Sequence, residues 1–221
     1  AIGFFLASFA WLFIAPLGAD AWRGMYLLGV LPALLVLWIR RGIPESARWE
    51  QADAARRAAR ARRTAGATLA PHEQLLVRFT LAELFADPLL RRRTLVTFAM
   101  SLTTTLAWWG ISTWVPPFIA ARAAAAGHAG PQWASYAGMA YTAGSIVGYA
   151  AFGFLADAWG RRPVTALYMA LAFALTPVLF LWTESLPLLL AAAFVNAVFS
   201  NGQYSWMPVW LPELFPTRVR A

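Results

Sequence analysis

Residues 153–162 read Gly-Phe-Leu-Ala-Asp-Ala-Trp-Gly-Arg-Arg, and they join two long apolar stretches, 133–156 and 164–183. Each stretch has close to the ~20 residues that a helix needs to cross the hydrocarbon core of a bilayer. The charged residues that separate them are too few to form an element of their own. This part of the chain therefore predicts two transmembrane helices joined by a short, basic turn.

Four further apolar stretches extend this pattern to the rest of the chain: 1–17, 25–39, 94–121 and 186–211. Of all 221 residues, 60% are hydrophobic and only 13% are charged, against about 25% charged in a typical soluble domain. Helices that are apolar on every side belong in lipid or in a very large core. The predicted fold class is an all-α polytopic membrane protein with six transmembrane helices.

The segment between the second and third stretches, residues 42–93, is rich in arginine. If it is cytoplasmic, the loop at 157–162 and the residues after 212 fall on the same side, and only Arg23 and Arg122 remain opposite. This asymmetry follows the positive-inside rule and sets the orientation. We expect a charged helical linker here, with anchoring to anionic lipid headgroups as the alternative.

Several other classes of protein are disfavoured. Topology accounts for the arginines, so the net charge of +8 does not indicate nucleic-acid binding. There is no cysteine, and His72 and His128 are far apart, so no metal site or other cofactor is predicted. No nucleophile–base pair or paired carboxylates lie in the apolar stretches, which argues against an enzyme.

Three motifs, all predicted at the cytoplasmic face, resemble those of one family. Residues 153–162 are similar to the G-x-L-a-D-x-x-G-R-[RK] loop of the major facilitator superfamily. Residues 44–49 resemble the P-E-S-P-R-W element of its sugar-porter-like and organic-acid-porter members, with Ala47 in place of the second proline. Residues 212–220 resemble their P-E-[LI]-[FY]-P-T-x-x-R element. The order of the motifs matches helices 5–10 of a twelve-helix transporter.

This resemblance implies a partial major facilitator fold. Residues 1–41 would be the last two helices of the N-terminal bundle, residues 42–93 a cytoplasmic linker, and residues 94–221 the start of the C-terminal bundle. The implied function is secondary active transport by alternating access in the cell (inner) membrane, as a monomer. The expected solute is a small organic anion, such as an aromatic acid, taken up with protons. A sugar porter and a transporter-like receptor or scaffold are the alternatives.

The resemblance also implies a gating motif at the cytoplasmic face. In it, Gly153 would permit close helix approach, Asp157 would cap a helix or pair with an arginine, and Gly160 would permit a tight turn. The remaining members of the motif are charged residues: Arg161, Arg162, Glu213 and Arg220.

Two polar faces indicate where the solute binds. Thr105, Trp108 and Ser112 share one helical face, with Trp109 beside it. A second face carries Asn196 and Gln203, with Asn201 and Tyr204 at its edge. Such faces must point at protein or at a water-filled cavity. All eight residues are predicted to line the solute site, and helix–helix hydrogen bonding is the alternative for each face.

Other residues are predicted to shape the helices. Ala140, Gly144 and Gly148 form a small-residue ridge that favours helix packing. Prolines should bend or end helices, and Pro116 and Pro117 are expected at the outer end of the third span. Trp114 and Trp206 are expected to be interface anchors. No ionisable residue lies in the middle of a span, so a proton carrier is expected elsewhere in the transporter.

Overall fold

The computed structural model describes residues 1–42, 44, 46–70, 73–74 and 84–216. In these ranges it is built of helices and contains no strand. The α-helices are α1 (Ile2–Ile14), α2 (Ala21–Gly42), α3 (Ala47–Thr64), α6 (Pro88–Ser112), α7 (Val115–Ala125), α8 (Gly130–Trp159), α9 (Arg161–Pro177), α10 (Leu186–Ser200) and α11 (Trp206–Leu214). Three short turns of 3-10 or π-helix interrupt them: η1 (Ala15–Leu17), η2 (Val178–Trp182) and η3 (Gly202–Ser205).

The helices confirm the predicted fold class. Among the described residues, five helical segments are long and apolar enough to cross a membrane, and Ile2–Leu17 is a shorter apolar one. The five are Ala21–Gly42, Pro88–Ala125, Gly130–Trp159, Arg161–Trp182 and Leu186–Leu214. Together, the six segments coincide with the six predicted spans, although most are longer than their apolar stretches.

The prediction that Pro116 and Pro117 end the third span is wrong. α6 ends at Ser112, and the two prolines lie in the first turn of α7, which continues to Ala125. A proline has no N–H to donate to the carbonyl four residues earlier, so the helix breaks there. The first turn of a helix tolerates proline because its N–H groups have no intrahelical acceptor. Two further prolines, which by the same rule should bend or end helices, differ in outcome. Pro177 is the last residue of α9, whereas Pro208 lies in the first turn of α11, which continues to Leu214.

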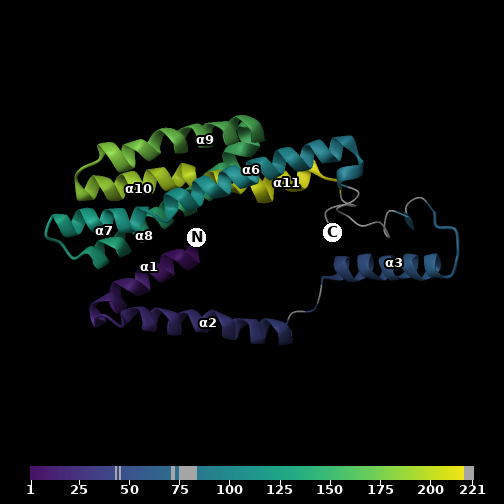
Figure 1. The fold of residues 1–221 in the computed structure, drawn as a ribbon, viewed down its shortest axis with the longest axis horizontal. Helices are drawn as coiled ribbons and strands as arrows, with labels where there is room; N and C mark the ends of the chain where they lie inside the picture. Colours follow the sequence, from purple (N-terminus) through teal and green to yellow (C-terminus); the bar gives the residue numbers. More distant parts are fainter. Residues whose placement is uncertain (43, 45, 71–72, 75–83, 217–221) are drawn as a thin grey trace. The chain divides into compact units, whose positions relative to one another are not determined.

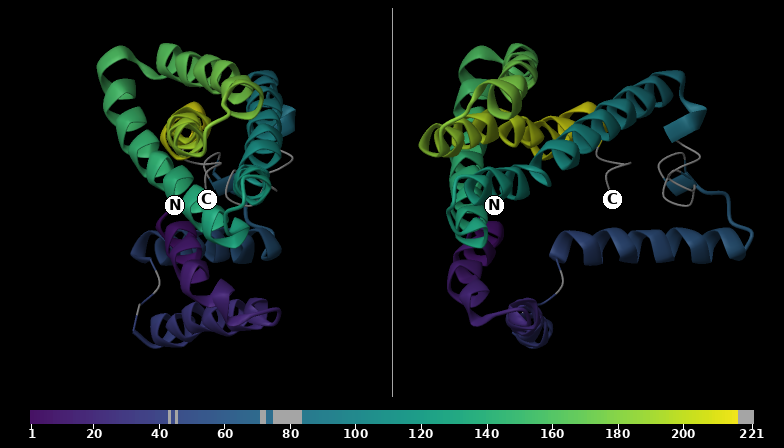
Figure 2. Two further views of the ribbon diagram at one scale, coloured as in Figure 1. Left: turned by 90° about the vertical axis from the view of Figure 1, so that its left-hand side faces the viewer. Right: turned by 60° about the vertical axis from the view of Figure 1, so that its left-hand side comes forward.

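The chain forms two compact units, of which the first comprises Ala1–Leu31 and Ser101–Trp210. α8 is its centre and contacts α1, α7, α9 and α10. α9 and α10 lie side by side (Figure 1), and Figure 2 shows α1 (purple) against α8. The buried core residues come from α7, α8, η2 and α10, and include Ile119, Ala137, Leu179 and Leu189.

The small-residue ridge of α8 packs as predicted. A Cβ atom at Gly144 would overlap the carbonyl oxygen of Phe194, and one at Gly148 would overlap that of Val198. Both carbonyls belong to the backbone of α10. The missing side chains therefore allow α8 and α10 to approach backbone to backbone, as small residues do in membrane proteins.

The second unit comprises Pro32–Met100 and the residues from Leu211 onward. The predicted charged linker contains α3, in which Arg57 pairs with Asp53 one turn earlier. Asp87 Oδ1 accepts hydrogen bonds from the amides of Leu89 (2.8 Å) and Leu90 (3.3 Å) at the start of α6. This cap satisfies amides that have no intrahelical acceptor, which explains why α6 begins before its apolar stretch.

Candidate functional site

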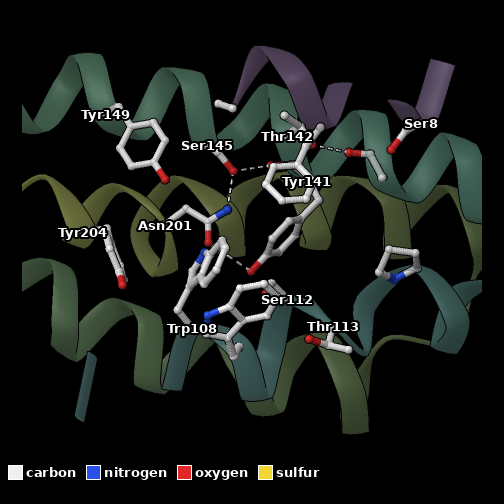
Figure 3. A pocket seen from close by; sticks show the side chains of 15 residues that line it. Ser8, Trp108, Ser112, Thr113, Tyr141, Thr142, Ser145, Tyr149, Asn201 and Tyr204 are labelled. Atoms are coloured by element: carbon white, nitrogen blue, oxygen red, sulfur yellow. Dashed lines mark hydrogen bonds between the residues drawn. The ribbon is translucent and has the colours of Figure 1, made fainter. Parts of the chain in front are cut away.

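The first unit contains a cavity of about 590 Å³, shown in Figure 3. Side chains of α1, α6 and α8 line it, together with the start of α7 and the segment that joins α10 to α11. Five of the eight residues predicted to line a solute site do so: Trp108, Trp109, Ser112, Asn201 and Tyr204. Two faces that are far apart in sequence thus meet at one cavity.

One wall of the cavity is aromatic. The ring centroids of Trp108 and Trp109 are 4.7 Å apart and edge-on, and Trp108 lies 5.7 Å from Tyr204. The Tyr204 hydroxyl is 2.8 Å from Thr105 Oγ1. Thr105 does not line the cavity, but its hydrogen bond fixes the ring that supports Trp108. Thr105 therefore supports the aromatic wall without lining the cavity.

Hydrogen bonds organise another part of the cavity lining. The Asn201 amide nitrogen donates to Ser145 Oγ, and Asn201 Oδ1 accepts from the Tyr141 hydroxyl at 3.4 Å. Figure 3 shows Asn201 between these two side chains of α8. The Tyr141 hydroxyl is also 3.1 Å from Ser200 Oγ. Both ends of the Asn201 amide are thus engaged by protein, which orients it.

Asn196 and Gln203 do not line the cavity. Asn196 is fully buried; its amide nitrogen donates to Thr176 Oγ1 and its Oδ1 accepts from Ser200 Oγ, both at 3.1 Å. It therefore supports Tyr141 and Asn201 from behind, through Ser200. Gln203 is 5% exposed and lies in η3. The helical spacing that grouped these residues fails because α10 ends at Ser200.

Sequence reasoning missed the contribution of α8 and α1. Tyr141, Ser145 and Tyr149 line the cavity at four-residue spacing, and Ser8 of α1 lines it beside them. That spacing marks one face of a helix and could have predicted a polar lining. The neighbouring glycine ridge predicts only helix packing. A Cβ at Gly138 would meet Ser8 Oγ, so α1 crosses α8 closely at the edge of the cavity.

The two tryptophans expected at the membrane–water interface differ in their exposure. Trp114 is 63% exposed. Trp206 is fully buried, and its Nε1 donates to Thr104 Oγ1 at 3.4 Å. The prediction for Trp206 is wrong because the break between α10 and α11 turns this side chain toward α6.

The predicted gating motif forms the turn between α8 and α9. Gly160 has a φ of +91°, which L-residues rarely adopt. Arg161 Nη1 lies 3.0 Å from Asp157 Oδ1 and 3.2 Å from the Ala156 carbonyl oxygen, so the arginine also holds the end of α8. Asp157 makes no side-chain cap at the start of α9.

The other predicted members of the motif are Gly153, Arg162, Glu213 and Arg220. No described atom lies within 4 Å of a Cβ built at Gly153, so the close approach expected there is not made within the described residues. Arg162 lies in the first turn of α9, and Glu213 lies in α11. Arg220 lies outside the described residues.

Comparison with known proteins adds independent evidence. Residues 1–221 match the family described as "Sugar (and other) transporter". Over 205 residues the chain is 29% identical to a protein of Cupriavidus pinatubonensis named "Probable 4-methylmuconolactone transporter", covering 91% of this chain and 41% of that protein. It is 24% identical over 203 residues to the sialic acid transporter of Escherichia coli, covering 90% and 43%. The chain spans less than half the length of these relatives. No solved structure matches it significantly.

Proposed function

This chain belongs to the sugar (and other) transporter family of the major facilitator superfamily, and from that premise we propose that the whole protein is a secondary transporter for a small organic anion. Family and relatives indicate a transporter of metabolites and not an enzyme. The proposed solute is an aromatic or similar cyclic acid, taken up together with protons across the inner membrane. Residues 1–41 would complete one helical bundle and residues 94–221 would begin the other, with residues 42–93 in the cytoplasm.

The cavity is the observation that carries this proposal. It lies among membrane helices, and its wall combines aromatic faces with hydroxyl and amide groups. Solute sites of secondary transporters lie near the bilayer midplane, at the junction of helical repeats. Aromatic surfaces suit a flat ring. Some relatives carry the names of organic-acid transporters, which supports an acid as the solute.

Uptake by the full-length protein in proteoliposomes tests the solute and the coupling. With the outside acidic by one pH unit, labelled benzoate should enter vesicles that contain the protein faster than protein-free vesicles, which report passive entry of benzoic acid. Its accumulation should approach about tenfold for one proton per anion, because one pH unit is worth about 1.36 kcal/mol. A protonophore should abolish the accumulation. Uptake of a hexose in place of benzoate would establish the sugar-porter alternative. Benzoate binding without counter-flow would establish the receptor alternative.

We further propose that the turn containing Asp157 and Arg161 is a cytoplasmic latch that stabilises one state of the transport cycle. Asp157→Ala in the full-length protein should lower the uptake rate at least ~10-fold. It should hardly alter thermal stability, because exposed ion pairs contribute only about 0.2–1 kcal/mol, and the Asp157 side chain is 74% exposed.

The matched control is Asp53→Ala, which breaks an exposed pair of the same four-residue spacing within α3. Uptake by that variant should equal wild type. Normal uptake by the Asp157→Ala protein, at equal expression, would refute the latch.

A further inference from the structure

The described lining of the cavity carries no charged side chain. Its polar groups are hydroxyls, one amide and indole N–H groups. A carboxylate moved from water into such surroundings loses hydration that neutral groups restore only in part. A solute acid in this cavity is therefore better placed with its carboxylate directed away from this wall and its uncharged end against it.

One donor on this wall has no acceptor. Within the described part of the chain, Trp108 Nε1 is buried without a hydrogen-bond partner. Buried indole N–H groups usually have one. The neighbouring Trp206 follows this rule, since its Nε1 bonds Thr104. Trp108 is thus an exception to this rule, and it belongs to the lining of the cavity.

Two aromatic rings pack against Trp108. Trp109 packs on one edge and Tyr204 on another, and the Tyr204 hydroxyl is tied to Thr105 at 2.8 Å. The one amide of the described lining is already engaged, because Asn201 is bonded to Ser145 and Tyr141. The indole N–H of Trp108 is thus an unpaired, directional donor beside an aromatic surface.

We propose that Trp108 selects the uncharged end of the solute, by donating its indole N–H to a neutral carbonyl-type oxygen on an unsaturated ring. The solute class is then a ring acid with a second, uncharged acceptor remote from its carboxylate. This inference rests on the proposed function, because it concerns the same cavity. The N–H is buried in the absence of solute, so in the proposed complex the indole rotates to expose it to the solute.

Two ring acids of nearly the same shape test it: 4-formylbenzoate carries the acceptor, and 4-vinylbenzoate has a carbon in its place. Binding to the purified full-length protein is measured by calorimetry, and uptake by competition with labelled benzoate. Wild type should prefer the formyl compound by about tenfold, equivalent to about 1.4 kcal/mol. Trp108→Phe, which keeps a ring but has no N–H, should reduce that preference to about twofold or less.

Trp109→Phe is the control, because it removes an indole N–H from the same cavity and should keep the tenfold preference. Equal affinity of wild type for both acids would overturn the inference without reliance on any variant. Equal weakening of both acids by Trp108→Phe would also overturn it, since the N–H would then serve the protein. If the protein prefers the formyl acid through Trp108 but takes up neither acid, the inference holds and transport is refuted. If it takes up both acids without a preference, transport holds and the inference is refuted.

Discussion

The Gly144→Leu protein is expected to lose its folded state in the membrane. A Cβ at this position would overlap the Phe194 carbonyl oxygen and would also press on the Cβ of Ala197. The first obstacle is backbone inside α10, so no side-chain rotation relieves it. Separating α8 from α10 would expose the core between them. Overpacking costs about 1–3 kcal/mol where side chains adjust, and more where backbone must move.

The measurement is the yield of monodisperse full-length protein after detergent extraction, which should fall at least ~10-fold. Val147→Leu is the control, because it adds bulk to the same helix at a residue that is 48% exposed. That variant should be extracted like wild type. Equal yields of the two variants would show that α8 and α10 do not pack through Gly144.

Trp206→Ala is expected to destabilise the protein by about 3–5 kcal/mol, the range for removing a large aromatic side chain from a core. Trp206 is fully buried, and it links α11 to Thr104 of α6 through its indole N–H. Removing it leaves a cavity and an unpaired hydroxyl. Unfolding in mild detergent with increasing sodium dodecyl sulfate measures the difference.

Trp114→Ala is the matched control, since Trp114 is 63% exposed. Its loss should change the free energy of unfolding by less than about 1 kcal/mol. Trp206→Phe, which fills most of the space but lacks the N–H, should fall between the two. If Trp206→Ala were as stable as Trp114→Ala, Trp206 would be at the interface, as first predicted.

The six spans and the basic turn were predictable because each depends on a property that extends over many residues. Apolar length determines a span, and Gly160 with Arg161 and Arg162 marks a turn by composition alone. The packing of Gly144 and Gly148 was also predictable, because regular four-residue spacing holds along the uninterrupted α8. These predictions tolerate errors of a few residues at helix ends.

The composition of the cavity was only partly predictable. Helical spacing grouped Asn196 with Gln203, but the turn η3 between α10 and α11 changes the direction of every side chain after Ser200. The same interruption buries Trp206. Tyr141, Ser145 and Tyr149 were missed because α8 uses adjacent faces for two purposes, packing and cavity lining. Such choices depend on which neighbour each face meets, and a single sequence does not state this.

The break between α6 and α7 has a consequence for the hydration of the cavity. Pro116 and Pro117 cannot donate to the carbonyl oxygens of Ser112 and Thr113, which precede them by four residues. Ser112, Thr113 and Pro116 all border the cavity. Backbone oxygens released from helical bonding are stable in a membrane only where protein or water can bond them. In the proposed transporter, this corner of the cavity is where we expect water to bond the backbone, and where a solute would exchange part of its hydration shell for protein.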